Sequence, residues 1–204
     1  MQESLSPRRR QLLEAAMRVV CDEGLRGLTH RAVDRRAGLP EGTCSAYLRT
    51  RHALQRALTE YVAGSLGDDV RSLAEELGSC PGDRGRAVEA TRSLFLRWLD
   101  ERDLLVAKLE LSLLAARDTD LASVLLASRT ELAAVVAGVV EGQAERQAEG
   151  RDERSLRAET LVGAFDGVLM AALLKPPAEQ HDFVSDAVAQ LLGALAPDPA
   201  GGPT

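Results

Sequence analysis

Arginines surround a short stretch of small and polar residues near the start of this 204-residue chain. They stand on both sides of residues 40–47, at Arg8, Arg9, Arg10, Arg31, Arg35, Arg36, Arg49 and Arg51. Guanidinium groups bind phosphate oxygens and fix register on a nucleic-acid backbone without reading its sequence. Small polar side chains between them leave room for base edges. The pattern predicts a surface that binds nucleic acid.

The distribution of charge along the chain supports this interpretation. Residues 1–60 hold 11 Arg and 7 Asp or Glu, a net charge of +4, whereas residues 61–204 carry −10, which gives −6 for the whole chain. A basic N-terminal part on an acidic protein is typical of a segment that meets a polyanion. A chance distribution is the alternative, since +4 is a modest charge.

Composition favours an all-α fold. The chain is 45% hydrophobic and 27% charged, enough to bury a core, and only 3% aromatic, with no strand-like alternation. It contains no run of 18 apolar residues, and MQESLSPRRR lacks the apolar stretch of a signal peptide. We therefore expect a cytoplasmic protein with no membrane partner.

The sequence contains no motif for catalysis or for metal binding. The cysteines (Cys21, Cys44, Cys80) and histidines (His30, His52, His181) are scattered, with neither disulfide nor zinc-ligand spacing. No glycine-rich phosphate loop or nucleophile motif occurs either. We expect no catalytic residue, no metal and no cofactor. For Cys44 we favour packing as a buried thiol over a redox role.

Helix signals place the arginines on a series of short helices. Ser6 as N-cap and Pro7 predict a first helix that ends at Gly24. Thr29 can cap a second helix, and Gly38 supplies its left-handed end.

A third helix is predicted with Pro40 and Glu41 in its opening turn, and a fourth from Thr50 toward Leu77. Five longer segments with helical periodicity follow, at about 83–101, 103–116, 118–148, 153–174 and 178–195. Residues 196–204 are expected to be disordered.

Two short helices joined by a glycine-containing turn predict a helix-turn-helix, whose second helix enters the major groove. If Cys44 and Leu48 face inward, Glu41, Gly42, Ser45 and Tyr47 face outward. The residues predicted to bind DNA are Arg8, Arg9, Thr29, His30, Arg31, Glu41, Gly42, Thr43, Ser45, Tyr47, Arg49 and Arg51.

Residues 10–54 resemble the N-terminal domain of the tetracycline-repressor (TetR) family of transcription regulators. The matching segments are LLEAAMRVVCDEG, LTHRAV, AGLPEGT and YL, followed by Arg51 and Leu54. The resemblance implies about nine helices: a DNA-binding domain at 1–52 and an effector-binding and dimerisation domain at 53–195. It implies a homodimer that binds a palindromic double-stranded operator and responds to a small-molecule effector.

The resemblance also implies roles for single residues. Thr29 and Tyr47 would contact phosphate, Thr43 and Ser45 would lie against the groove, and Arg51 stands where the family usually has a phosphate-binding Lys. The chain departs from the family at four positions, Asp34, Pro40, Ser45 and Leu48, where Ala, Ser, Tyr and Phe are common. We expect Asp34 to pair with a neighbouring arginine on its own helix.

Small residues at four-residue spacing predict a dimer interface near the C-terminus, because they let another helix approach closely. The predicted interface residues are Gly163, Gly167, Val168, Ala171, Val184, Val188 and Leu191. Packing within the chain's own core is the alternative.

Two carboxylates on apolar helix faces, Glu110 and Asp166, suggest an effector site for a lipophilic cation. Its predicted residues are Phe95, Trp98, Leu109, Glu110, Leu113, Phe165, Asp166 and Met170. An internal pair with Arg97, Arg117 or Arg129 is the alternative for either carboxylate. The function predicted is therefore a ligand-responsive repressor, with a ligand-independent DNA-binding or architectural protein as the alternative.

Overall fold

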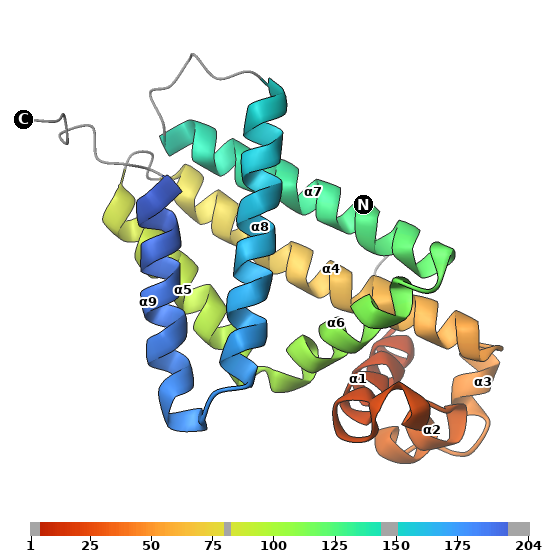
Figure 1. Ribbon diagram of the computed structural model, residues 1–204. Coiled ribbons are helices and arrows are strands. Elements are labelled where there is room, and N and C mark those ends of the chain that lie inside the picture. Colours follow the sequence, from red (N-terminus) through yellow and green to blue (C-terminus); the bar gives the residue numbers. More distant parts are fainter. Residues whose placement is uncertain (1–4, 80–82, 144–150, 196–204) are drawn as a thin grey trace, which may run out of the picture. The chain divides into compact units, whose positions relative to one another are not determined.

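The computed structural model describes residues 5–79, 83–143 and 151–195, and in them it is helical with no strand (Figure 1). These residues form α1 Pro7–Gly27, α2 His30–Ala37, α3 Thr43–Tyr47, α4 Arg51–Gly78, α5 Arg84–Asp100, α6 Arg102–Ala115, α7 Thr119–Gln143, α8 Arg151–Leu173 and α9 Pro177–Leu195. The all-α prediction is confirmed. None of these described helices is both long and apolar enough to cross a membrane. The expected disordered tail, 196–204, lies outside the described residues.

The chain divides into two compact units, and α4 and α7 each run from one into the other. Unit 1 comprises Met1–Leu66 and Glu101–Ser128, and unit 2 comprises Gly67–Asp100 and Arg129–Thr204. The expected DNA-binding segment, 1–52, falls within unit 1, which also contains α6. A functional boundary at residue 52 stays a prediction.

The start of α1 follows its capping signals. The Ser6 hydroxyl accepts a hydrogen bond from the Arg9 N–H at 3.3 Å, and Pro7 begins the helix. Its inward face, which includes Leu12, is buried and packs against α2 and α6. The predicted end at Gly24 is a break rather than a stop: Gly24 has φ 68° and ψ −178°, and a short turn continues to Gly27.

Both ends of α2 also match their signals. The Thr29 hydroxyl accepts from the Ala32 N–H at 3.2 Å, and Gly38 ends the helix at φ 67° and ψ 33°. The predicted start of α3 at Pro40 and Glu41 is wrong, because Gly42 has φ 92°, which an α-helix cannot include. Residues 40–42 therefore form a turn, and α3 is a single helical turn.

The start of α4 is confirmed within one residue: the Thr50 hydroxyl accepts from the Ala53 N–H at 3.0 Å, and the helix begins at Arg51. In unit 2, α9 packs against α5 and α8. Val184 and Val188 on α9 are completely buried within the single chain. Both were expected at a dimer interface, but they have no surface left to offer a partner, so we assign them to the core of unit 2.

Candidate nucleic-acid interface

The buried carboxylate of Asp34 fixes the start of α3. Its two oxygens accept hydrogen bonds from the backbone N–H groups of Gly42, at 2.8 Å, and Cys44, at 2.7 Å, and its side chain is 1% exposed. The expected pair with an arginine on α2 is wrong, because Asp34 lies on the inward face of α2 with Ala32 and Val33. Instead it binds backbone donors that α3 leaves unpaired at its N-terminus.

His30 fixes the other end of α3. Its Nε2 lies 2.6 Å from the carbonyl oxygen of Leu48, the residue that follows the helix, and must carry the hydrogen in order to donate to it. The ring is half-buried. His30 was expected to contact DNA, and the structure gives one of its nitrogens a positioning role. Asp34 and His30, both on α2, therefore hold α3 at its two ends.

Two contacts hold α2 on α1. The Gln11 side chain donates to the carbonyl oxygen of Ala37 at 3.0 Å, and Arg36 pairs with Asp22 at 2.6 Å. The three helices are therefore linked by polar contacts as well as by their apolar faces. This leaves the outer face of α3 preorganised before any ligand arrives.

The predicted outward residues do lie at the surface. Tyr47 is 50% exposed, and Glu41 and Gly42 are exposed as well. Thr43 and Ser45 are half-buried, and their hydroxyls donate to the carbonyl oxygens of Pro40 and Gly42 at 2.7 and 2.9 Å. With the hydroxyl hydrogens engaged, the oxygens are left as acceptors. Base amino groups are the DNA atoms that could donate to them.

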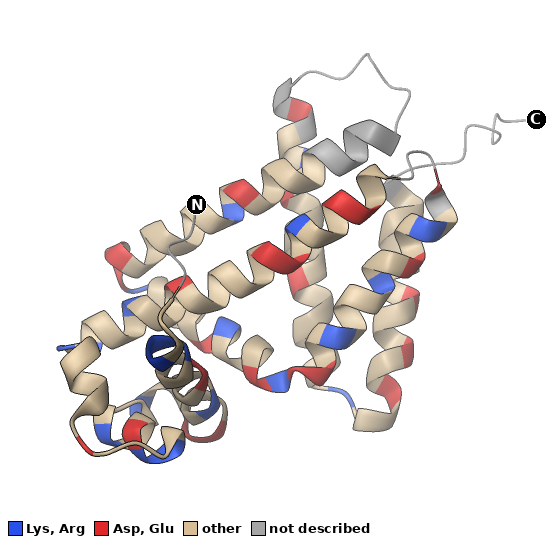
Figure 2. Cartoon of the chain, turned by 180° about the vertical axis from the view of Figure 1, so that it is seen from behind, with Lys and Arg blue, Asp and Glu red and all other residues tan. Residues whose placement is uncertain are grey.

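The arginines around this face differ in how they are held. Arg31 and Arg49 are exposed, and Arg31 lies 3.8 Å from Glu41. Arg51 is anchored, because its Nη2 donates to the carbonyl oxygen of Leu25 at 2.6 Å. Arginine positions, coloured blue on the ribbon in Figure 2, recur along α1 and α2.

Among the residues expected near DNA on the first two helices, Arg8 and Thr29 are exposed. The Arg8 guanidinium donates to Gln11 at 2.9 Å. Arg9 is half-buried, and its Nε is buried with no hydrogen-bond partner in the described part of the chain. Contact between any of these residues and DNA stays a prediction.

Cys44 packs as a buried thiol, as favoured from the sequence. Burial and, to a smaller extent, the nearby Asp34 carboxylate together raise the pKa of the thiol to about 11. The thiolate is the reactive form, so this environment opposes a redox role at neutral pH.

Unit 2 contains an aromatic cluster, formed by Phe95, Trp98 and Phe165. The ring centroid of Phe95 lies 5.1 Å from that of Trp98 and 4.6 Å from that of Phe165. The Trp98 indole N–H donates to Asp69 at 2.7 Å, and Arg97 lies 3.4 Å from the other oxygen of Asp69. Asp69 on α4 is a carboxylate beside these rings that the sequence analysis missed.

The other predicted effector residues are distributed over both units. Asp166 pairs with Arg129 at 2.6 Å, which is the internal partner weighed as the alternative. Met170 on α8 is 50% exposed. Leu109 and Glu110 on α6 are half-buried and Leu113 is 65% exposed, all in unit 1. A site shared by these α6 residues and those of unit 2 stays a prediction.

The remaining predicted interface residues have surface to offer. Gly167 is exposed, and a Cβ placed on it would meet no atom within 4 Å. Gly163, Val168, Ala171 and Leu191 are half-buried. A second chain could therefore approach α8 closely at Gly167. Dimerisation through this face stays a prediction.

Comparison with known proteins identifies the family. Residues 82–195 match the family model described as Tetracyclin repressor-like, C-terminal domain. A search of curated protein sequences found no significant match.

Similar solved structures include a transcriptional regulator from Rhodococcus sp. Rha1, 23% identical over 92% of this chain and 95% of its own, with a TM-score of 0.73. The fatty acid degradation regulator FadR from Bacillus halodurans is 18% identical over 95% and 98%, with a TM-score of 0.75. The multidrug binding protein EbrR, in complex with imidazole, is 25% identical over 96% and 93%, with a TM-score of 0.64. The family model matches more than half of the chain and is independent of the resemblance in residues 10–54. The chain therefore belongs to the tetracycline-repressor (TetR) family of transcriptional regulators.

Proposed function

We propose that this chain is a homodimeric repressor that binds a palindromic operator and is released by a small effector. The observation that carries the DNA-binding part is the outer face of α3, exposed at Tyr47 and fixed from below by Asp34 and His30. A surface held in place before binding loses little freedom on binding. Exposed arginines beside it supply the phosphate contacts.

Each chain of the dimer would place its α3 in the major groove. Gly42 and Ser45 face the base edges, the Tyr47 hydroxyl donates to a phosphate, and Arg31 and Arg49 bind the backbone on either side. A two-fold dimer repeats this arrangement at two half-sites about 34 Å apart, one turn of DNA. Operator symmetry then follows from protein symmetry.

For the effector we propose a lipophilic cation held at the aromatic cluster of unit 2. Rings attract cations through their faces, and the Asp69 carboxylate beside Trp98 supplies a countercharge. The related EbrR has been solved with proflavin and with malachite green, both cationic dyes. Asp69 is a better candidate for the countercharge than Asp166, because the Arg97–Asp69 ion pair, at 3.4 Å, is longer than the Arg129–Asp166 pair, at 2.6 Å.

Release requires that the effector prefer one conformation of the protein. Suppose that the effector binds more tightly to a conformation in which the α3 helices of the two chains do not fit successive major grooves. Binding of the effector then lowers the affinity of the dimer for its operator. The loss in operator affinity cannot exceed the effector's differential affinity for the two states.

The DNA-binding proposal is tested by selecting duplexes from a random pool with the full chain, then titrating the selected duplex by fluorescence anisotropy. We expect an inverted repeat, and an affinity that falls steeply with salt. Arg49→Ala should lower the slope of log affinity against log salt by about one. The control is Arg92→Ala on α5, an arginine that is also exposed but lies outside the interface. Equal slopes for the two variants would contradict the assignment.

The effector proposal is tested by quenching of Trp98 fluorescence, the only tryptophan, with malachite green. Asp69→Asn keeps an acceptor for the Trp98 N–H but removes the charge, and should weaken dye binding about tenfold. Asp100→Asn, an exposed carboxylate on α5, is the control, and Glu110→Gln tests the α6 carboxylate. Dye binding that leaves operator affinity unchanged would favour the ligand-independent alternative.

A further inference from the structure

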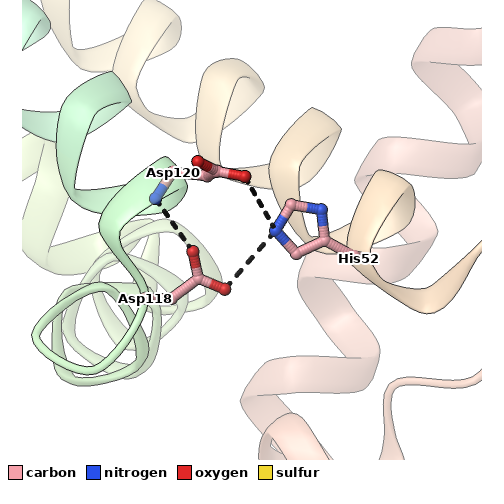
Figure 3. Close-up of side chains that lie close together, drawn as sticks. All are labelled: His52, Asp118 and Asp120. Atoms are coloured by element: carbon pink, nitrogen blue, oxygen red, sulfur yellow. Dashed lines mark hydrogen bonds and ion pairs between the residues drawn. The ribbon is translucent and has the colours of Figure 1, made fainter.

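Three side chains from separate parts of the sequence converge in unit 1 (Figure 3). His52 lies in the first turn of α4, Asp118 directly precedes α7, and Asp120 lies in the first turn of α7. The His52 Nε2 is 3.4 Å from Asp118 Oδ2 and 3.9 Å from Asp120 Oδ2. One nitrogen and two carboxylate oxygens therefore lie within 4.8 Å of one another.

The carboxylate of Asp118 is held in position by the backbone of α7. Its Oδ1 accepts the N–H groups of Asp120 and Leu121, each at 3.1 Å, and so caps the helix. Its Oδ2 is left to face His52. The two oxygens therefore have separate tasks, and hydrogen bonds to the first orient the second, as outer-shell contacts do for metal ligands.

The spacing suits ligands of one ion better than it suits hydrogen bonds. A single N–H on Nε2 cannot donate well to two oxygens, and 3.4 and 3.9 Å exceed the usual N–H···O range. Ligands bonded to Zn²⁺ at about 2.0–2.2 Å with tetrahedral angles lie roughly 3.3–3.5 Å apart. The 3.4 Å separation of His52 Nε2 and Asp118 Oδ2 fits this range, whereas Asp120 Oδ2, at 3.9 Å, would move about half an ångström closer on binding. The three side chains are partly exposed, so water can complete the coordination.

We propose that His52 Nε2, Asp118 Oδ2 and Asp120 Oδ2 bind one divalent transition-metal ion of the Zn²⁺ type. Imidazole nitrogen suits zinc, nickel and copper, whereas magnesium and calcium prefer all-oxygen sites. The ion would link the first turn of α4, directly after the predicted DNA-binding residues, to the start of α7. Cysteine and histidine spacing gave no sign of this site, because two of its three proposed ligands are carboxylates far from His52 in the sequence.

The described thiols, Cys21 and Cys44, are poor competitors for the ion. Burial raises the pKa of both Cys21 and Cys44 to about 11, and a thiol binds zinc as the thiolate. Among the described residues the His52 cluster is the one group of three or more metal-ligating side chains that converges in this way.

The test is isothermal titration of the full chain with ZnCl₂ in chelator-free buffer, without DNA or dye, so its result is independent of the proposed function. We expect one equivalent bound with micromolar affinity, weakened at least about tenfold by His52→Gln and by Asp118→Asn. Asp118→Asn retains an oxygen to cap α7. His181→Gln is the matched control, because His181 also faces a carboxylate, Asp100, at 2.8 Å, but only one.

Three results would overturn the inference: a wild-type chain that binds no zinc below about 100 μM, His52→Gln that binds it as tightly as wild type, or magnesium that binds equally well. Far-UV circular dichroism of the metal-free variants checks folding. Asp120→Asn, the most exposed position of the three, provides a further variant if Asp118→Asn unfolds, and it should show the same loss.

Discussion

Replacing Asp34 by alanine removes the only side chain that binds the backbone N–H groups of both Gly42 and Cys44 in the described structure. The two hydrogen bonds are charge-assisted, a class that contributes about 1.5–3 kcal/mol each. Gly42 is exposed, so water can replace the lost acceptor there, but Cys44 is buried and its N–H would stay unpaired. We therefore expect Asp34→Ala to lower the free energy of unfolding of unit 1 by about 2–4 kcal/mol.

Two comparisons make the expectation specific. Asp34→Asn keeps one acceptor oxygen without charge and should cost about half as much. Asp22→Asn removes the partner of Arg36 on the same three helices, and as a partly exposed ion pair it should cost about 0–1 kcal/mol. We therefore expect the largest loss of stability in Asp34→Ala, a smaller loss in Asp34→Asn and the smallest in Asp22→Asn.

The assay is urea unfolding followed by far-UV circular dichroism, with hydrogen exchange at the Cys44 amide as the local probe. Exchange at this amide should accelerate more in Asp34→Ala than exchange in α9, which lies in unit 2. The variant should also lose operator affinity, because the start of α3 is no longer held. A stability loss no larger than that of Asp22→Asn, with unchanged exchange at Cys44, would show that Asp34 does not hold the start of α3.

Three further outcomes follow from the geometry. In a background that lacks the other two cysteines (Cys21→Ser with Cys80→Ser), Cys44 should react with a thiol reagent at pH 8 about a hundredfold more slowly than a thiol with the ordinary pKa of 9.0, before any effect of steric burial. Rapid reaction would contradict this. Gly38→Ala should destabilise the chain by about 1 kcal/mol, measured by urea unfolding, because Gly38 has a φ of 67° that alanine rarely adopts, although an added Cβ would meet no atom within 4 Å. Gly78→Ala should cause no such loss, because a Cβ there also meets no atom within 4 Å and the backbone is not left-handed. Burial raises the pKa of Tyr61 above its ordinary value of 10.0, so the folded state favours the neutral phenol and stability falls as the pH rises above 10.0. Tyr61→Phe should therefore lose less stability than wild type above pH 10.0, measured by urea unfolding. Identical losses would show that Tyr61 is not responsible.

Local signals predicted the frame of the DNA-binding helices well. Ser6, Thr29 and Thr50 each cap the helix that follows, and Gly38 ends α2 in the left-handed conformation. These features depend on residues three or four positions apart, so a single sequence contains them. The start of α3 was misplaced because Pro40 and Glu41 are good first-turn residues, whereas the conformation of Gly42 depends on its bond to Asp34.

Contacts between distant segments could not be predicted in the same way. Asp34 was expected to find an arginine, because helical spacing shows the neighbours on its own helix and not the N–H groups of the next one. Asp69 joins Trp98 from another helix, and His52 meets Asp118 across a long stretch of sequence. Val184 and Val188 show the same limit, since an apolar face does not reveal whether its own chain or a partner covers it.

Hydroxyl-radical footprinting on the selected duplex can show whether the outer face of α3 binds DNA at two symmetric half-sites, as we propose. We expect two protected patches on one face of the duplex, about 34 Å apart and related by a dyad. Protection should be lost with Tyr47→Ala and retained with Arg92→Ala. A single asymmetric patch, or protection that survives the loss of Tyr47, would contradict it.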